Sequence, residues 1–279
     1  MKTILLPTDF SKNSINAINY AVKLLEHDTC SFYVMNVQKA SSFISDDLMT
    51  VSSSATIYNT LVDAAKRSIS NIISQLKKKY KNKSHTFYSI VDYDNFIDAI
   101  NQTCEVNSVD LIIMGTKGAS GLNKILFGSN TVHVMQRCNV PVLAIPDTCK
   151  FKKIDTVAFS CSFSTSYAAQ SFKILIDLVS NFKAKLKVLH VIEDYNFEEK
   201  RIENMNFFKE NFIEVTVDRK PLEDKDVFKT IHDYIISNDV KIIAMLSKKH
   251  SFLERLFSKH VVETFAFKID IPFLVLKQH

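Results

Sequence analysis

The amino-acid sequence predicts an α/β protein built from two tandem domains of similar design. Its 279 residues are 46% hydrophobic and 23% charged, an ordinary globular composition with enough apolar material for a core. Short apolar runs alternate with longer segments whose apolar residues recur every three to four positions. The second half of the chain repeats this plan, which indicates an internal duplication. Strand–helix–strand–helix order predicts a parallel sheet with helices on both faces in each half.

The first half is expected to contain five strands, because it holds five runs rich in Val, Ile, Leu and Phe without polar alternation, as in strands covered on both faces. These expected strands are Thr3–Leu6, Ser31–Val37, Thr86–Val91, Leu111–Met114 and Val142–Ile145. Helices are expected between them, over Ser14–Leu25, Ala55–Lys79, Asn95–Val106 and Asn130–Arg137.

The second half is expected to hold five more strands, at Thr156–Phe159, Lys185–Val191, Phe212–Val217, Lys241–Met245 and Phe273–Leu276. Two local matches support the duplication. The segment Ile4–Ser11 (ILLPTDFS) matches Val157–Ser164 (VAFSCSFS), and Asn139–Ile145 (NVPVLAI) matches Asp270–Leu276 (DIPFLVL). We therefore expect one domain over residues 1–147 and a second over residues 151–279.

Charge and cysteine content narrow the classes of function. The net charge of +5 is mild, and the basic cluster Lys77–Lys83 (KKKYKNK) follows an amphipathic stretch, so it is read as a solvated helix end rather than a nucleic-acid surface. Pro7 and Asp9 come too early for a signal peptide, and no apolar run approaches the ~20 residues of a membrane span. The five cysteines form no CxxC pair and the eight histidines show no metal-ligand spacing. These features predict a soluble, cytoplasmic protein without a metal site.

All four glycines of the chain lie between Gly115 and Gly128, whereas average usage would place roughly 20 in a chain of this length. Gly115 and Gly118 follow an expected strand, at the carboxyl edge where open α/β sheets bind ligands. Gly128 precedes an expected helix start, where free N–H groups and a partial positive charge attract anions. Glycine would let the backbone approach such an anion closely. The cluster predicts a phosphate site, although each single glycine is also explained by an ordinary turn.

The spacing Gly115-x2-Gly118-x9-Gly128-Ser129 resembles the G-2x-G-9x-G-(S/T) signature of the ATP-binding branch of the universal stress protein family. The segments Pro7–Ser11 (PTDFS) and Asn139–Pro146 (NVPVLAIP) are also similar to that family. The resemblance covers residues 1–146 well and residues 151–279 more weakly. It implies a Rossmann-like, five-stranded parallel sheet of strand order 3-2-1-4-5 in each half.

The resemblance also implies roles for individual residues. Asp9 would hold the ribose hydroxyls, because a carboxylate accepts two O–H bonds; the alternative is that Asp9 only caps the following helix. Pro7 and Thr8 would line the same edge, and Asn36-Val37, which closes the second expected strand, would present backbone groups to adenine. The residues expected around the triphosphate are Gly115, Gly118, Gly128 and Ser129, helped by the amides of Asn130 and Thr131. Met114, at the end of the preceding strand, is also expected to belong to the nucleotide site. Lys117 and Ala119 stand where relatives often carry His and Arg, so this chain lacks those two side chains.

The second half has lost these features. Asp9 corresponds to Ser162, and an offset of 130 residues places Met245, Lys248, Ser258 and Lys259 opposite Gly115, Gly118, Gly128 and Ser129. We therefore expect no ATP binding by this route in the second domain.

The function expected is that of an ATP-binding regulatory stress-response protein, which holds ATP, with or without Mg²⁺, in its first domain only. The alternatives are a slow ATPase or nucleotidyl-transferring enzyme, for which no catalytic residue is identified, and a scaffold with a vestigial nucleotide site. Val140–Pro146 and Ile271–Leu276 are apolar strand candidates, and bare strand edges invite pairing. The two domains are therefore expected to form an intramolecular pseudo-dimer, with a homodimer of whole chains left open.

Overall fold

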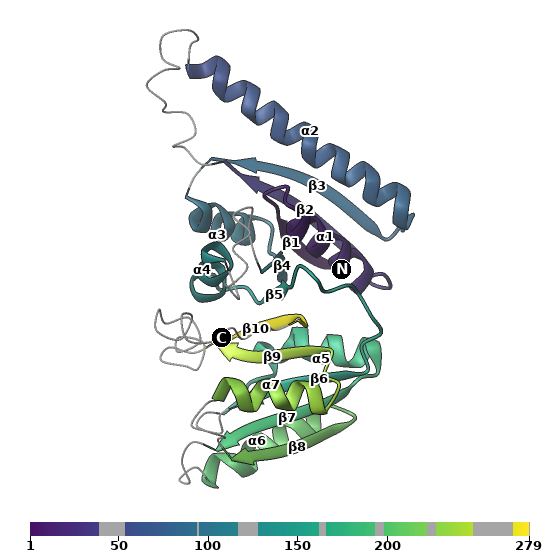
Figure 1. The fold of residues 1–279 in the computed structure, drawn as a ribbon, viewed down its shortest axis with the longest axis vertical. Coiled ribbons are helices and arrows are strands. Elements are labelled where there is room, and N and C mark those ends of the chain that lie inside the picture. The colour runs from purple at the N-terminus through teal and green to yellow at the C-terminus, as the bar shows by residue number, and fades with distance from the viewer. Residues whose placement is uncertain are drawn as a thin grey trace. The chain divides into compact units, whose positions relative to one another are not determined.

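The computed structural model describes residues 1–38, 54–93, 95–116, 128–161, 166–192, 198–221, 227–247 and 270–278. These residues fall into two compact units, one up to residue 140 and one from residue 141 onward. Both units are α/β structures of mainly parallel strands with helices (Figure 1), which confirms the predicted fold class. The domain boundary expected between residues 147 and 151 stays a prediction.

The first unit contains a parallel sheet of strand order β3-β2-β1-β4. Its strands are β1 (Lys2–Pro7), β2 (Cys30–Val37), β3 (His85–Asp92) and β4 (Leu111–Gly115). The central strands are continuous apolar runs because both of their faces are covered: Ile4, Leu5 and Leu6 in β1 are fully buried.

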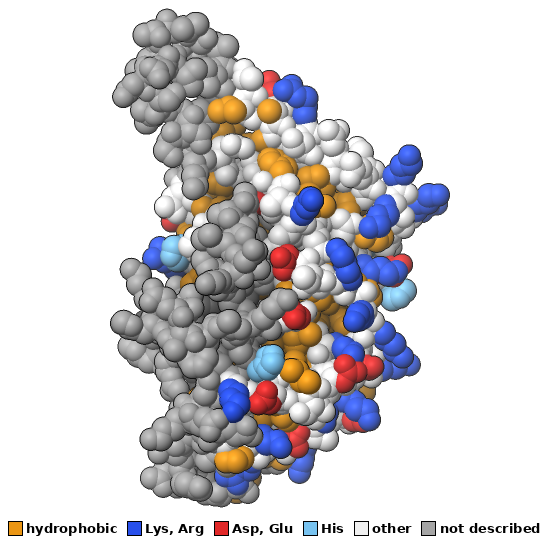
Figure 2. Space-filling model, viewed as in Figure 1, with side chains coloured by type: hydrophobic (Ala, Val, Ile, Leu, Met, Phe, Trp, Pro, Cys, Tyr) orange, Lys and Arg blue, Asp and Glu red, His pale blue; other side chains and the backbone are white. Residues whose placement is uncertain are grey.

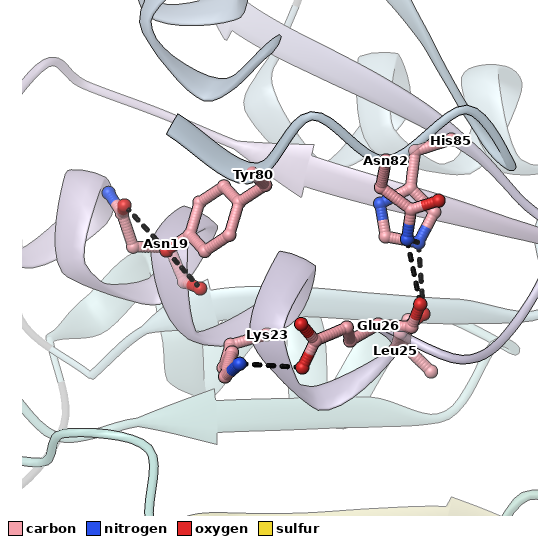
Figure 3. Close-up of polar contacts among 7 residues, drawn as sticks. All are labelled: Asn19, Lys23, Leu25, Glu26, Tyr80, Asn82 and His85. Carbon is pink, nitrogen blue, oxygen red and sulfur yellow. Dashed lines mark hydrogen bonds and ion pairs between the residues drawn. The ribbon is translucent and has the colours of Figure 1, made fainter. Parts of the chain in front are cut away.

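The described part of the first unit also contains the helices α1 (Lys12–Leu24), α2 (Ser54–Tyr80), α3 (Phe96–Val106) and α4 (Ser129–Arg137). Right-handed crossovers place α1 and α2 on one face and α3 and α4 on the other. Side-chain contacts agree: Asn19 Oδ1 on α1 accepts hydrogen bonds from Lys79 Nζ (2.7 Å) and from the Tyr80 hydroxyl (3.0 Å) of α2. The second of these is drawn in Figure 3.

At the amino edge of this sheet, a hydrogen bond and a ring contact connect β3 to the end of α1 and to β2 (Figure 3). His85 is buried at the start of β3, and its Nε2 donates to the carbonyl oxygen of Leu25 at 2.9 Å. The Phe32 ring meets the His85 ring edge-on at 4.9 Å. Nearby, Lys23 and Glu26 form an exposed ion pair at 2.6 Å.

The basic cluster Lys77–Lys83 lies where α2 ends. Lys77, Lys78 and Lys79 occupy the last turn, where cations interact favourably with the helix dipole. Figure 2 shows Lys and Arg side chains standing out along this side of the molecule, with hydrophobic and acidic side chains among them. The cluster is therefore adequately explained as a helix end.

The second unit repeats the sheet. Its strands β6 (Thr156–Cys161), β7 (Lys185–Ile192), β8 (Val215–Pro221), β9 (Ile242–Ser247) and β10 (Phe273–Lys277) lie in the order β8-β7-β6-β9-β10. Counted within this half, the order is 3-2-1-4-5, as the resemblance implied. Its helices are α5 (Ala169–Phe182), α6 (Glu198–Asn211) and α7 (Val227–Ser237).

An aromatic cluster joins α5 and α6 to the second sheet. Phe172 of α5 lies between Phe159 of β6 (ring centroids 4.9 Å apart) and Phe207 of α6 (5.0 Å). Phe208 of α6 is fully buried beside them, 5.8 Å from Phe159. Offset and edge-on aromatic pairs add stability beyond the area that they bury.

Strand β5 (Val142–Ile145) belongs to the second compact unit although the sequence places it at the end of the first half. It pairs antiparallel with β10, with Leu143 opposite Leu274 and Val142 opposite Val275. The two apolar segments that were expected to cover each other are therefore hydrogen-bonded neighbours. The first unit retains the other four strands in the implied order.

The expected strand at Phe212–Val217 is corrected by the structure. Phe212 continues the turn that ends α6, since its N–H donates to the carbonyl oxygen of Phe208 at 3.1 Å. Its side chain is buried and its ring lies 6.2 Å from that of Phe208. The strand β8 begins only at Val215, so this apolar residue serves helix packing rather than the sheet.

Among the described residues, no helix is long and apolar enough to cross a membrane, and no group of three or more His, Cys, Asp or Glu side chains could hold a metal ion.

Burial raises the pKa of the Cys30 and Cys104 thiols to about 12. Both thiols are therefore protonated at neutral pH and act as small apolar core residues.

The pair formed by the buried Tyr234 and the half-buried Asp218 provides a test of the second unit's stability. The Tyr234 hydroxyl donates to the Asp218 carboxylate, and burial, with that hydrogen bond, raises the pKa of Tyr234 far above its usual value. Replacing Tyr234 by phenylalanine removes the hydroxyl and leaves the half-buried Asp218 carboxylate without this hydrogen-bond donor. For Tyr234→Phe we expect the free energy of unfolding at pH 7 to fall by about 1–3 kcal/mol.

The pH dependence follows from the direction of the pKa shift. Because the folded-state pKa is raised, the stabilisation is complete below the unfolded pKa of about 10 and declines above it. Urea unfolding followed by circular dichroism should therefore show a smaller difference between variant and wild type near pH 10.5 than at pH 7. Tyr88→Phe, at a side chain that is 44% exposed, is the matched control. An equal loss for both variants would contradict this account.

Candidate nucleotide-binding site

The strand order places the carboxyl ends of β1 and β4 next to each other at a change of chain direction. From β1 the chain crosses to β2 on one side, and from β3 it returns to β4 on the other side of β1. Open α/β sheets bind ligands in the crevice outside the strand ends at such a point. The segments that follow β1, β2 and β4 are therefore the candidate site.

Thr8 anchors the turn that follows β1. Its N–H donates to the carbonyl oxygen of Met35 at 2.8 Å, and its hydroxyl lies 2.9 Å from that of Ser14 on α1. The Thr8 hydroxyl also accepts from the N–H of Phe10 at 3.0 Å. Phe10 has a φ of 63°, a left-handed conformation that costs a non-glycine residue roughly 1–2 kcal/mol. Pro7 and Thr8 are buried, so this turn is a fixed element of the edge.

Asp9 is exposed on the same turn, but it is not the cap of α1. That role belongs to Ser11, whose hydroxyl accepts from the Ser14 N–H at 3.2 Å. Asp9 Oδ1 accepts from the N–H of Ser11 at 3.0 Å and thereby braces the turn. Its carboxylate stands at the carboxyl edge of the sheet, where the ribose role would require it; that role stays a prediction.

The end of β2 is tied to the end of β1 through a side chain. Asn36 is 5% exposed, and its Nδ2 donates to the Thr8 carbonyl oxygen at 2.7 Å. Its Oδ1 accepts from Gln38 Nε2 at 2.5 Å. Val37, the residue expected to face adenine, lies between these two amides and is half-buried. Sequence reasoning named Asn36 only as the neighbour of Val37, although an amide residue inside an apolar strand was the available signal.

Gly115 ends β4 beside the Asn13 side chain of α1. A Cβ added at Gly115 would lie 2.8 Å from both Cγ and Nδ2 of Asn13 on α1, a separation that real Cβ atoms essentially never show. Close packing of helix on strand therefore explains this glycine directly. Met114, the preceding residue, is 6% exposed.

The start of α4 is held against the end of β4 by two hydrogen bonds. The N–H of Gly128 donates to the Thr116 carbonyl oxygen at 2.6 Å, so the described residues on either side of 117–127 meet. The Thr131 hydroxyl donates to the Gly115 carbonyl oxygen at 2.9 Å, and Thr131 is 2% exposed. Its side chain therefore points inward, and only its backbone N–H can serve a ligand.

Gly128 is the N-cap of α4 and supplies no side-chain cap. The first N–H groups of a helix lack partners within it, and here no cap side chain accepts from them. Ser129 and Asn130 in this turn are exposed. The φ of Gly128 is −64°, so its conformation does not by itself demand glycine. Gly118, together with Lys117, Ala119 and Gly121, lies outside the described residues.

The second unit keeps the scaffold and changes the residues at its strand ends. Ile4 is in register with Leu111, as the corresponding Val157 is with Ile242. This register corrects the repeat offset on this strand to 131 residues, so Leu246 rather than Met245 corresponds to Gly115. The other positions compared in the sequence, Ser162, Lys248, Ser258 and Lys259, lie outside the described residues.

The tie between the first two strands also has a counterpart in the second unit. His190 occupies the position of Asn36, and its Nδ1 donates to the carbonyl oxygen of Cys161 at 3.4 Å, as Asn36 does to that of Thr8. The fold thus uses the same connection twice, with different side chains.

The fold and the strand-end site together define a doubly wound α/β protein of the type that binds ligands at its carboxyl edge. The model of the universal stress protein family matches residues 1–146, so the chain belongs to that family. Two universal stress proteins of Methanocaldococcus jannaschii are similar to it. MJ0531 is 26% identical over 145 residues, which cover 52% of this chain and 81% of the relative. MJ0577 is 26% identical over 154 residues, which cover 52% of this chain and 94% of the relative.

A solved structure resembles the whole chain. The universal stress protein of Archaeoglobus fulgidus DSM 4304 superposes with a TM-score of 0.68 at 19% identity, covering 99% of this chain and 96% of that one. At this identity the likeness concerns the fold alone, and it extends over both halves.

The close contact at Gly115 leads to a test of the packing that shapes the site. For Gly115→Ala we expect the free energy of unfolding, measured with urea, to fall by about 1–3 kcal/mol, because the new methyl group overpacks the contact with Asn13. The cost should shrink when the same change is made in an Asn13→Ala background. An equal cost in both backgrounds would show that the two residues do not meet as described.

Proposed function

We propose that the first unit binds an adenine nucleotide, ATP, at the carboxyl edge of its sheet, and that bound nucleotide regulates the protein. The observation that carries the proposal is the start of α4: an N-terminus without a side-chain cap, fastened to the end of β4 by Thr131 and Gly128. Such a terminus offers backbone N–H groups and a partial positive charge to an anion.

The neighbouring strand ends suit the rest of the nucleotide. Asp9 is exposed on the rim and would accept hydrogen bonds from the ribose hydroxyls. Val37 would offer backbone groups to the adenine ring, and the amides of Ser129, Asn130 and Thr131 would meet the phosphates. Gly118 completes the spacing that resembles the ATP-binding branch of the family. Mg²⁺, if it accompanies the nucleotide, would be held largely by the phosphates. Contacts of this kind are consistent with micromolar affinity, about −8 kcal/mol.

The second unit has a different part in this proposal. Leu246 replaces the glycine that ends the corresponding strand, and we infer that this unit binds no ATP by the same route. Its strand β10 instead covers the edge of β5 by antiparallel pairing, as in a pseudo-dimer within one chain.

Calorimetric titration of the purified full chain with ATP tests the nucleotide site. Wild type should bind with micromolar affinity, and Asp9→Ala should weaken binding about tenfold, the loss expected for a charge-assisted hydrogen bond. Asp28→Ala is the matched control, because Asp28 pairs with Lys2 at the amino edge of the same sheet (3.2 Å). No binding by wild type would overturn the proposal, and steady release of phosphate from Mg-ATP would favour the enzyme alternative.

The role of β10 is tested by producing residues 1–147 alone. This fragment exposes the edge of β5, which pairs with β10 in the whole chain. Uncovered strand edges promote self-association, so we expect the fragment to dimerise or aggregate in sedimentation experiments under conditions where the full chain does not. A fragment that stays soluble and monomeric at high concentration would contradict the pseudo-dimer.

A further inference from the structure

We propose that Asn36 is a positioning residue that holds the base-contacting end of β2 in line with the ribose-contacting end of β1. The inference rests on the proposed nucleotide site and assigns to that site a residue that would not itself touch the nucleotide. It follows from the hydrogen bonds at the ends of the two strands.

The ladder between β1 and β2 ends with Pro7 opposite Met35. Beyond it, the two chains are connected by the bond from the Thr8 N–H to the Met35 carbonyl oxygen and by the bond from Asn36 Nδ2 to the Thr8 carbonyl oxygen. The Asn36 side chain thus extends the connection past the end of the ladder. Thr8 precedes Asp9 directly and Asn36 precedes Val37 directly, so this bond fixes the spacing between the two residues proposed to contact ribose and adenine.

Gln38 sets the orientation of the Asn36 amide. Gln38 Nε2 donates to Asn36 Oδ1, which leaves Asn36 Nδ2 as the group that faces Thr8. The Gln38 backbone is held in turn, because its N–H donates to the Asp92 carbonyl oxygen on β3 at 2.8 Å. A chain of hydrogen bonds therefore crosses three strand ends, and buried networks of this kind rigidify the backbone that they join.

The second unit supports a distinct role for the amide. His190 makes the corresponding bond at 3.4 Å, longer than the 2.7 Å of Asn36, and the position of Gln38 is occupied by Ile192, which carries no side-chain amide. The unit that is proposed to bind nucleotide therefore has the shorter of the two ties.

The phosphate end of the site is positioned independently. The start of α4 is fastened to β4 through Thr131 and Gly115, and the bonds that involve Asn36 do not reach it. Loosening the strand ends should therefore weaken the grip on adenine and ribose while the backbone amides that meet the phosphates keep their places. This separation distinguishes positioning from a general loss of structure.

The experiment is a calorimetric comparison of ATP with inorganic triphosphate, using the full chain as wild type, Asn36→Ala and Asn36→His. Asn36→Ala should bind ATP about tenfold more weakly, the equivalent of one well-placed hydrogen bond, and bind triphosphate as wild type does. Asn36→His should recover part of the ATP affinity, because His190 shows that histidine can make the same bond. Asn19→Ala, on α1 at the contact with Tyr80 (Figure 3), should leave both affinities unchanged.

The outcomes separate this inference from the proposed function. ATP binding by Asn36→Ala at wild-type strength, or equal weakening for ATP and triphosphate, would overturn the positioning role and leave the nucleotide site standing. Wild type that binds ATP but not triphosphate would also overturn it, since the phosphate end would then not act independently. Wild type that binds neither would overturn both. Should Asn36→Ala fail to fold, Gln38→Ala serves instead, with a loss of about threefold for ATP alone.

Discussion

Thr8 uses its N–H, its carbonyl oxygen and its hydroxyl to hold the end of β1 in place. The backbone groups bond to Met35 and to the Asn36 side chain, and the hydroxyl bonds to Ser14 and to the Phe10 N–H. One buried residue thereby connects the first strand, the second strand and the first helix. The left-handed conformation of Phe10 is tolerated because these bonds over-determine the turn, and strain of this kind is commonly found at ligand sites. The exposed position of Asp9 is a consequence of that turn.

Comparison of the two halves separates what the fold requires from what the proposed site requires. Both halves keep the same strand order, the same register between first and fourth strands, and a side-chain tie between first and second strands. They differ at Gly115 and Leu246: in the first half the Asn13 side chain occupies the space that a Cβ at Gly115 would need. A sheet of this kind is therefore stable with either set of strand ends, and the residues confined to the first half are candidates for ligand binding rather than for folding.

The fold class could be predicted from the sequence because unbroken apolar runs such as Leu111–Met114 have few alternatives to a strand covered on both faces. Partners distant in sequence were harder to predict. Nothing local reveals that Asn36 bonds to Thr8, or that Asn13 lies against Gly115, because both contacts depend on the three-dimensional register. The prediction for Phe212 was wrong for a related reason. An apolar residue next to an expected strand can belong either to the strand or to the packing of the preceding helix, and its contact with Phe208 of α6 shows that Phe212 belongs to the helix packing.

Of the two glycines that the structure describes, Gly115 is explained by space rather than by backbone conformation. Phe10, Lys81, Ser108, Lys183 and Asp239 all adopt positive φ without being glycine. The chain therefore accepts left-handed turns at ordinary residues, at the moderate cost that such turns carry. A glycine also serves where a side chain would not fit. Gly115 shows this directly, since its missing Cβ would collide with Asn13.

Gly128, with an ordinary φ of −64°, leaves the start of α4 free of a capping side chain. Absence of a side chain is thus the property that both positions share, and it is the property that an anion meeting backbone amides would require.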